Sequence, residues 1–518
     1  MFRDLRNFAR LWVIGRTLAR YDALFLLKIH PAGAFIARVC GLLWWPRKDV
    51  RALRPGLRLA LALTALGPTF IKFGQALSTR ADLLGEQEAA DLSELQDRLP
   101  PFPFAQAKQA IEEDFGRPLA TIYASFDETP VAAASIAQVH FATTVEGTSV
   151  AVKVLRPAIK AAFVRDLDLM FWMAEKAARY APRLRRLKPL EVVQTFAETV
   201  NLEMDLRFEA AAAQELKENF TGSPIFYVPA IDWQLTSERI LTMERVSGTR
   251  VDDRAAVSAI GVDPVQVVRN AAEIFFRMVF DHGFFHADMH PGNLFVTKTS
   301  AIIAMDFGIM GRVDSETQKT LGEMLLGFLT RDYKKVADVH VRAGFVPSEK
   351  DVDMFAQACR SIAEPILGKP IAEISIAKLL GQLFRVTETF EMQVQPQLLL
   401  LQKSMLLAEG VGRGLAPEVN MWELARPLIE GWMRARLGPE GRAVDAVASA
   451  IGTLQSLPRV IARVDAITSD IEKGGLRLHP DSARAIMGEA GERRGAHRWL
   501  IWAPWVLAAV LGAALILN

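Results

Sequence analysis

Apolar and polar residues alternate most clearly between residues 149 and 155, which read Ser-Val-Ala-Val-Lys-Val-Leu. Successive side chains of a strand point to opposite faces, so this run predicts a strand with two apolar faces. One of these faces also carries Lys153. Two further apolar runs, 294–296 and 301–305, flank a short polar segment and predict a pair of strands joined by a turn.

Several other stretches are predicted to be helical, either from their residue types or from the spacing of their apolar residues. Residues 203–216 are rich in Glu, Ala and Leu, which favour helix, and residues 163–199 are also helical in composition. An amphipathic helix is expected to start near Thr69. Asp314 opens a capping-box pattern, and the apolar positions that follow it predict another helix. Strands and helices of this kind indicate an α+β protein.

The N-terminal segment, residues 1–60, is expected to be basic and amphipathic. Arginines and lysines outnumber aspartates there and alternate with Phe, Leu and Trp. Such a segment can lie on an anionic bilayer surface or dock on the rest of the protein, and the sequence leaves both interpretations open. It lacks the apolar core and the small-residue cleavage site of a signal peptide.

The C-terminal residues 499–517 are apolar throughout. A run of this length crosses a hydrocarbon core of roughly 30 Å, so it predicts a single transmembrane helix. Three arginines precede the run, and the positive-inside rule then keeps residues 1–498 in the cytoplasm. A buried C-terminal helix is the alternative interpretation. Residues 436–498 are expected to form a helical spacer.

The composition agrees with a large protein associated with a membrane. The chain has 518 residues, enough for more than one domain, and is 51% hydrophobic with a mean hydropathy of +0.16. A net charge of +2 gives no bulk electrostatic case for nucleic-acid binding. Cys40 and Cys359 are the two cysteines, which excludes a disulfide framework or a thiolate metal cluster.

Residues 286–308 have the layout of a phosphoryl-transfer site. They read His-Ala-Asp-Met-His-Pro-Gly-Asn, then an apolar run, then Asp-Phe-Gly. The reaction needs a carboxylate near the attacking oxygen, which Asp288 supplies, and oxygen ligands for Mg²⁺, which Asn293 and Asp306 supply. In kinase-like enzymes the Asp and Asn lie on a catalytic loop and the Asp-Phe-Gly follows a short strand, in agreement with the predicted hairpin.

Lys153 is expected to complete this site. A lysine among the apolar residues of a strand is costly unless its charge is used. An edge strand with a solvated lysine is the alternative; beside the 286–308 pattern, a lysine that grips phosphates is favoured. It needs a carboxylate partner, and Glu203, Asp205 and Glu209 are candidates that lie on different sides of a helix. Ordinary solvated helix carboxylates are the alternative for these three.

Three further motifs resemble those of a known family. Lys72-Phe-Gly-Gln75 is similar to the KxGQ motif, Glu203-Met-Asp205 to the ExD motif, and Ala132-Ala-Ala134 to the alanine-rich loop of the UbiB family. This family consists of atypical, protein-kinase-like ATPases linked to ubiquinone biosynthesis. The resemblance covers nearly the whole chain.

The resemblance implies a site for ATP and Mg²⁺. It implies that Lys153 grips the α- and β-phosphates and pairs with Glu209, that Asp288 is the catalytic aspartate, and that Asn293 and Asp306 bind Mg²⁺. It also places the KxGQ element over the active site, where a peptide docks in ordinary kinases. The other implied catalytic residues are Lys72, Gln75, Glu203 and Asp205. The other implied nucleotide-binding residues are Val131, Ala132, Ala133, Ala134, Ser135, Ala137, Gln138, Met243, Glu244 and Val246.

Three alanines stand where kinases carry glycines, and this predicts a stiffer loop with an altered grip on the nucleotide.

Two departures from ordinary protein kinases concern the substrate. Glu209 lies 56 positions after Lys153, far more than one strand-to-helix connection needs, so a helical insert is expected between them. No Ala-Pro-Glu follows Asp306-Phe-Gly308, and a helix is expected to begin soon after it. These features count against a general protein substrate.

The resulting prediction is a two-lobed, protein-kinase-like α+β fold with an N-terminal helical extension and a C-terminal transmembrane helix. A basic segment, 1–60, precedes a helical KxGQ extension, 61–118. The kinase-like domain covers 119–435, with a helical insert at 160–200.

The favoured function is Mg²⁺-dependent ATP turnover at the bacterial inner membrane, in support of ubiquinone biosynthesis. The expected partners are membrane lipid, quinone precursors and other ubiquinone-biosynthesis proteins, while the oligomeric state is left open. One alternative is a kinase that acts on a small molecule, a lipid or a protein. Another is a non-catalytic scaffold that senses nucleotide.

Overall fold

The computed structural model describes most of the chain up to Leu437. The described residues are 2–25, 43–50, 52–78, 86–93, 95, 99–180, 189–369, 373, 382, 385–387, 389–392 and 396–437. The described residues up to Trp432, apart from Arg179 and Tyr180, belong to one compact unit.

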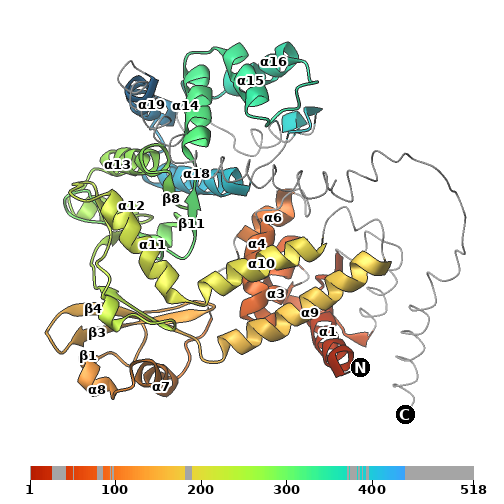
Figure 1. Cartoon of the computed structure of the whole chain (residues 1–518), viewed down its shortest axis with the longest axis vertical. Coiled ribbons are helices and arrows are strands. Elements are labelled where there is room, and N and C mark those ends of the chain that lie inside the picture. Colours follow the sequence, from red (N-terminus) through yellow and green to blue (C-terminus); the bar gives the residue numbers. More distant parts are fainter. Residues whose placement is uncertain are drawn as a thin grey trace, which may run out of the picture. The chain divides into compact units, whose positions relative to one another are not determined.

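Several helices of the described chain precede the first sheet, and those of the N-terminal region come first (Figure 1). They are α1 (Phe2–Arg20), α3 (Pro55–Leu66), α4 (Pro68–Ser78) and α6 (Glu86–Ser93). α4 begins one residue before the predicted start, and α3, α4 and α6 pack on one another around Leu63, Phe70 and Ile71. These helices share one hydrophobic core with the strands that follow.

The first sheet confirms the strand predicted at 149–155. Its strand order is β1-β3-β4-β6, all antiparallel, and β2 pairs with β3. The strands are β1 (Tyr123–Phe126), β2 (Ala132–Ala133), β3 (Ala137–Thr144), β4 (Ser149–Leu155) and β6 (Ile240–Glu244). Val150, Val152 and Val154 pack on one face with α7 (Phe104–Phe115) and α8 (Leu119–Ile122). Ala151 and Leu155 pack on the other face with the helices.

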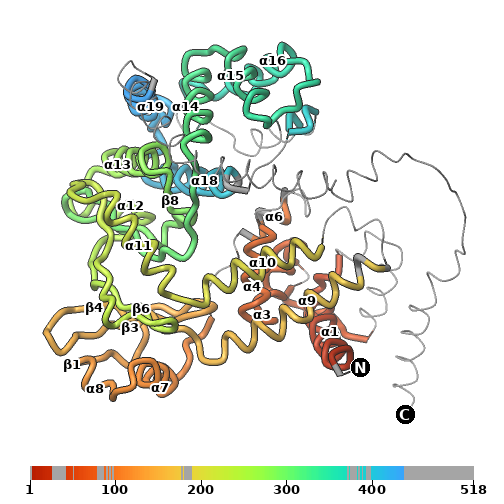
Figure 2. The backbone as a smooth tube through the Cα atoms, in the orientation of Figure 1, coloured from red at the N-terminus to blue at the C-terminus, as the bar shows by residue number. Residues whose placement is uncertain are grey.

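The insert after β4 consists of two long helices, which Figure 2 traces out and back. α9 (Ile159–Tyr180) packs on α1, and α10 (Pro189–Glu203) packs on α4. The prediction of one helix across 203–216 is wrong: α10 ends at Glu203 and α11 (Leu206–Asn219) begins after an extended Asp205. A backbone bond from Leu206 N to Glu238 O holds the break.

The N-terminal helix docks on the insert. Arg3 pairs with Asp168 at 2.9 Å and Arg10 pairs with Asp166 at 2.8 Å, so the basic residues of α1 meet acidic residues of α9. Trp172 Nε1 donates to Asp4. The basic segment was expected either to lie on a bilayer surface or to dock on the rest of the protein, and α1 docks on the protein. Large apolar side chains remain exposed on the same region, namely Leu5, Phe8, Trp12 and Trp45.

The second half of the unit carries two smaller sheets. One has the order β5-β10-β9-β7, and the other pairs β8 with β11. The strands are β5 (Phe226–Tyr227), β7 (Thr249–Arg250), β8 (Phe284–His286), β9 (Leu294–Val296), β10 (Ile302–Ala304) and β11 (Met310–Arg312). β9 and β10 pair in antiparallel fashion, which confirms the predicted hairpin. Its turn places Ser300 at a φ of 63°.

Helices surround these strands and continue to the end of the described chain. They are α12 (Arg254–Ala259), α13 (Pro264–Phe276), α14 (Ser315–Leu329), α15 (Tyr333–Arg342), α16 (Val352–Ala363), α18 (Pro396–Leu415) and α19 (Met421–Leu437). α14 fits the capping prediction only in part. Asp314 accepts a hydrogen bond from Thr317 N, but Gln318 donates to Val279 O instead of reaching back to the cap.

Several predictions lie outside the described residues. These are the transmembrane helix at 499–517, most of the spacer at 436–498, and Cys40. Within the described part of the chain, no helix combines the length and apolar character that a bilayer crossing requires. Cys359 is buried in α16 and is not bonded to another cysteine.

Candidate phosphoryl-transfer site

Lys153 joins the first sheet to α11. It points from β4, and its Nζ lies 2.8 Å and 2.9 Å from the two carboxylate oxygens of Glu209, in the first turn of α11. Both side chains are mostly buried, at 13% and 7% exposed. Burial raises the pKa of Glu209, whereas the ammonium of Lys153 opposes that rise. The pair keeps a lysine charge in place within an apolar region.

The same ammonium reaches the Asp-Phe-Gly segment. Lys153 Nζ lies 3.3 Å from Asp306 Oδ1, and the carboxylate of Asp306 is about half exposed. The charge of Lys153 lowers the pKa of Asp306 well below its ordinary value, and Lys72 adds to this effect. Burial lowers the pKa of Lys153, but Asp306 and Glu209 outweigh it and raise that pKa overall. Asp306 also adopts a φ of 61°, a left-handed backbone that a non-glycine residue seldom takes.

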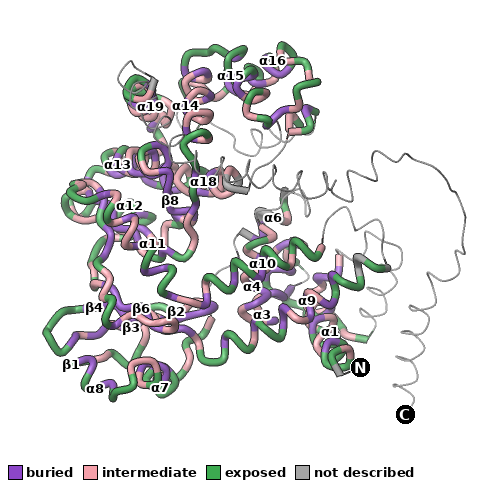
Figure 3. The backbone as a smooth tube through the Cα atoms, viewed as in Figure 1, coloured by how far each residue is buried: buried purple, intermediate pink, exposed green. Residues whose placement is uncertain are grey.

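The predicted catalytic loop follows β8, which is buried along its length (Figure 3). His286 ends the strand, and its Nδ1 accepts a hydrogen bond from Asp288 N at 3.1 Å. Burial lowers the pKa of His286, so its ring stays neutral and can accept. Asn293 Nδ2 donates to Asp288 O at 3.3 Å. This loop presents a carboxylate that is one-third exposed.

Asn293 and Asp306 meet at the open end of the β9–β10 hairpin. Met305 N donates to Asn293 O at 2.8 Å, which sets Asn293 beside the residue that precedes Asp306. The donor set fits Mg²⁺: one carboxylate and one amide are hard oxygen ligands, and this ion usually takes its other ligands from phosphates and water. Within the described residues, no group of three or more His, Cys, Asp or Glu side chains forms a metal cage.

The KxGQ segment lies on α4 and reaches the same region. Lys72 Nζ lies 2.9 Å from Glu203 Oε2, and both side chains are largely buried. Gly74 is required by packing, because a Cβ there would lie 2.7 Å from Leu63 Cδ1 and 2.8 Å from Leu95 Cδ1. Gln75, three positions after Lys72, is half-buried. The effect of Lys72 on the pKa of Asp306 shows that α4 contributes charge to the site.

Asp205 has a structural partner. Its carboxylate accepts from Arg207 N and pairs with the Arg207 guanidinium at 2.7 Å, so it caps α11. This guanidinium lowers the pKa of Asp205. Glu203 and Asp205, predicted to lie on one helix, thus belong to the end of α10 and to the cap of α11.

The alanine-rich loop is a tight hairpin. Val131 N donates to Val139 O, and Ala134 N donates to Ala137 O, so the turn closes over Ser135. Arg156 holds its tip, because the guanidinium donates to Ala134 O at 2.8 Å and 3.0 Å. This clamp and the missing glycines are consistent with the stiff loop expected from the sequence.

Other residues predicted to bind nucleotide line the first sheet. Gln138 is fully buried: its amide bonds to the backbone of Phe102, and its backbone lies in β3 between β2 and β4. Met243 is buried in β6 and Val246 is half-buried after it. The carboxylate of Glu244 accepts from Tyr227 Oη at 2.6 Å and Ala230 N at 3.1 Å. In this segment, the predicted hinge, the side chains of Met243 and Glu244 are therefore buried or bonded within the protein, and Glu244 N donates to Ala230 O.

Sequence reasoning gave no role to Lys403. Its Nζ lies 2.9 Å from Asp288 Oδ1, across 115 positions of sequence. The residue lies in α18, in a leucine-rich run without any motif of phosphoryl-transfer chemistry. The one local signal in the sequence is a lysine that closely follows four successive leucines.

Comparison with known proteins gives the class first. The ABC1 atypical kinase-like domain matches residues 94–340, and the UbiB helical domain matches residues 359–420. A Mycobacterium tuberculosis protein, Rv3197, solved as a complex with erythromycin, superposes with a TM-score of 0.52 at 23% identity, covering 69% of this chain and 91% of that one. The fold is therefore that of an atypical kinase-like domain followed by a helical domain.

Curated relatives then give the family. The protein from Marinobacter nauticus named probable protein kinase UbiB is 42% identical over 469 residues, which cover 90% of this chain and 85% of that protein. The Aeromonas hydrophila protein of the same name is 45% identical over 403 residues, covering 77% and 74%. The chain belongs to the UbiB family, which confirms the resemblance seen in its motifs.

Proposed function

We propose that this protein binds Mg²⁺-ATP and cleaves its γ-phosphate. The observation that carries the proposal is the contact of one ammonium, Lys153, with both Glu209 and Asp306. Such an ammonium is held at a fixed position between the sheet and the Asp-Phe-Gly segment, where it can hold phosphate oxygens. The names of the curated relatives, which call them probable protein kinases, support the same conclusion.

The site residues then take distinct roles. Lys153 would hold the α- and β-phosphates, and Asn293 and Asp306 would hold Mg²⁺, which would supply positive charge to neutralise the phosphates. Asp288 accepts the proton of the attacking hydroxyl, because its carboxylate lies on the loop that follows β8 and remains about one-third exposed. Lys72 adds positive charge from α4. The alanine-rich hairpin and the hinge at 243–246 hold the nucleotide through backbone groups.

The proposed setting is the inner face of a bacterial membrane. Residues 499–517 would anchor the chain by a single helix, with the kinase-like domain in the cytoplasm. The exposed apolar side chains of the N-terminal region, such as Trp12 and Trp45, are suited to a lipid surface. There ATP turnover would assist ubiquinone biosynthesis by making lipid-soluble quinone precursors accessible to partner enzymes.

The fate of the γ-phosphate tests this proposal. The full chain would be placed in anionic liposomes containing a quinone-precursor analogue and given ATP labelled at the γ-phosphate. We expect label in inorganic phosphate, and a higher rate with liposomes than without them. A turnover rate that is the same with and without the lipid and the quinone analogue would contradict the membrane coupling. The absence of ATP turnover would contradict the proposal that the protein is an enzyme.

A kinase is the second candidate, favoured by the exposed carboxylate of Asp288, which is placed to activate an acceptor hydroxyl. Label that appears on a lipid, a small molecule or a protein would establish the kinase and identify the acceptor.

A nucleotide-sensing scaffold is the remaining possibility, and the ubiquinone content of cells tests it. If a chain carrying Asp288→Asn supported normal ubiquinone production, a nucleotide-sensing scaffold would replace both enzymatic functions.

A further inference from the structure

The carboxylate of Asp288 already has a cationic partner, and that partner comes from the helical domain. Lys403 Nζ lies 2.9 Å from Asp288 Oδ1. The two side chains are 33% and 32% exposed, so the pair is neither sealed in the core nor free in solvent. A pair with this exposure can still meet a substrate that enters the site.

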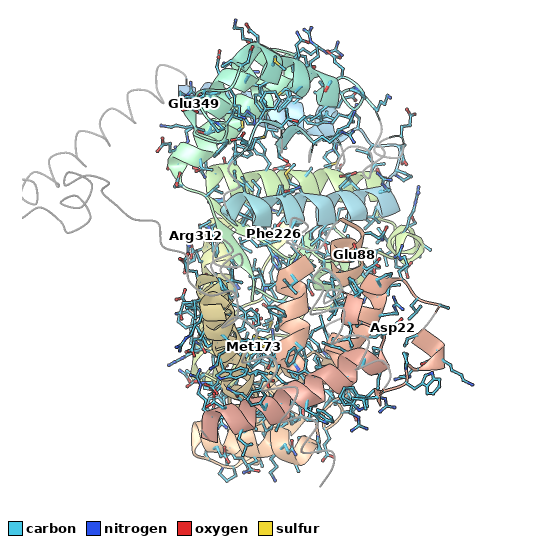
Figure 4. All side chains as sticks on the ribbon, turned by 90° about the vertical axis from the view of Figure 1, so that its right-hand side faces the viewer. Asp22, Glu88, Met173, Phe226, Arg312 and Glu349 are labelled. Atoms are coloured by element: carbon cyan, nitrogen blue, oxygen red, sulfur yellow. The ribbon has the colours of Figure 1, made fainter. Side chains whose placement is uncertain are left out.

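The position of Lys403 is built into the fold. Its neighbour Ser404 is fully buried, and Ser404 Oγ donates to His286 O at 3.3 Å. His286 ends β8 and leads directly into the catalytic loop. α18 also packs along α13, as Figure 4 shows for the blue helix and the green helix beside it. The helix turn that carries the lysine is therefore attached to the strand that carries the aspartate.

The catalytic loop has no lysine or arginine of its own to serve Asp288. His290 lies two residues further on, but its Nδ1 accepts from Gly292 N at 3.1 Å and so caps the turn at 291–293. The other two lysines of the site have carboxylate partners elsewhere. Lys153 pairs with Glu209 and Asp306, and Lys72 pairs with Glu203. Lys403 is thus the lysine that the structure places at Asp288.

We propose that Lys403 is a substrate-contacting cation of the reaction, which stabilises the phosphoryl group while it is transferred. This proposal rests on the proposed function. The transferred group passes through a loose transition state whose charge lies on three equatorial oxygens. Lys153 and Mg²⁺ serve the nucleotide side of that group. An ammonium 2.9 Å from the carboxylate that receives the proton is close to the place where the attacking oxygen arrives.

The step balances without a further reagent. The attacking oxygen forms a bond to the γ-phosphorus while the bond from that phosphorus to the bridging oxygen of ADP breaks. The electron pair of the broken bond stays on ADP, and the proton of the attacking hydroxyl goes to Asp288. Lys403 keeps its protons throughout and supplies charge and orientation. The helical domain, residues 359–420, is then part of the active site rather than an appendage.

The test compares Lys403→Met with Lys403→Arg in the full chain, in liposomes, with ATP affinity measured separately by calorimetry. Lys350→Met is the matched control, because Lys350 pairs with the exposed Glu391, outside the site. We expect Lys403→Met to lower kcat by about 10²-fold while ATP affinity and KM change by less than about threefold. Lys403→Arg should recover part of kcat, and Lys350→Met should behave as wild type.

Each other outcome has a definite meaning. If Lys403→Met keeps the kcat of wild type, this proposal is overturned and the proposed function stands. If it loses ATP binding together with kcat, or if Lys403→Arg recovers nothing, Lys403 has a structural role and the proposal also fails. If Asp306→Asn turned over ATP as fast as wild type, both proposals would be overturned.

Discussion

Lys153 illustrates how much a single residue reveals before the fold is known. The alternation of 149–155 placed it correctly on an apolar strand. The residues alone left its partner open among three carboxylates. The fold decides in favour of Glu209, because the chain breaks between α10 and α11 and Asp205 becomes a cap. That break depends on a backbone bond to Glu238, a contact with no local sequence signal.

Glu209→Gln should weaken the site by releasing Lys153. The amide keeps the shape of the side chain but removes the charge that fixes the ammonium, so Lys153 is left with Asp306 alone. We expect KM for ATP to rise by about tenfold, the equivalent of about 1.4 kcal/mol. Steady-state kinetics would measure this.

Glu215→Gln on the same helix serves as the control, because Glu215 pairs with the exposed Arg312 at the surface. Equal effects of the two substitutions would show that the Lys153 pair has no special role in nucleotide binding.

Lys403 shows where sequence reasoning ends. Its helix is apolar and ordinary in pattern, and the contact with Asp288 joins residues 115 positions apart. Asp288, Asn293 and Asp306 were predictable because their motif lies on one hairpin with a local spacing. Lys403 lies on a separate helix, at no fixed short distance in sequence from this motif, so only tertiary packing brings it into the site.

Among the elements, α4 is the one whose packing most directly serves the site. It carries Lys72 on one side and Gly74 on the side that faces α3. Its amphipathic character and nearly its start were predictable from the sequence, since apolar spacing within a helix is a local property. The ion pair with Glu203 depends on how the insert folds back, which the composition of 163–199 does not specify.

Gly74→Ala should therefore destabilise the protein. The added methyl group would overlap the ends of two buried leucines, Leu63 and Leu95, which must move to admit it. We expect a loss of about 1–3 kcal/mol in the free energy of unfolding, measured by denaturant titration. ATP turnover should fall as well, because Lys72 moves with α4.

Gly15→Ala is the matched control, because a Cβ at Gly15 on α1 meets nothing within 4 Å. Alanine should there raise stability by about 0.5–1 kcal/mol, as expected within a helix. If both substitutions changed stability in the same direction, the close packing of α4 on α3 would not be what requires Gly74.

Over the whole molecule, burial of histidines couples stability to pH. Burial lowers the pKa values of His140, His282, His286 and His340 below the ordinary 6.5. In the unfolded chain these rings titrate at their ordinary value. At mildly acidic pH the unfolded state therefore binds more protons than the folded state, and acidification favours unfolding.

We expect Tm to be highest above about pH 7 and to decline as the pH falls toward about 5. His340→Gln should make this decline shallower, because it removes one buried ring whose Nδ1 donates to Val336 O within α15. Thermal unfolding at a series of pH values would measure both. A Tm that is constant or rises on acidification would be incompatible with neutral buried histidines.

Three regions of the chain each bring one lysine to a carboxylate of the site. Lys72 comes from the N-terminal extension, Lys153 from the first sheet and Lys403 from the helical domain. Lys153 lies in the part that matches the ABC1 domain and Lys403 in the part that matches the UbiB helical domain, so both matched domains contribute to the set. The central claim is that this assembly is a working Mg²⁺-ATP site.

The most direct test is the Mg²⁺ dependence of ATP turnover by wild type and Asp306→Asn. Asp314→Asn is the matched control, because Asn caps a helix about as well as Asp and this residue caps α14. We expect turnover that requires Mg²⁺, that falls by about 10²-fold or more in Asp306→Asn, and that persists in Asp314→Asn. Turnover without Mg²⁺, or an Asp306→Asn variant as active as wild type, would contradict it.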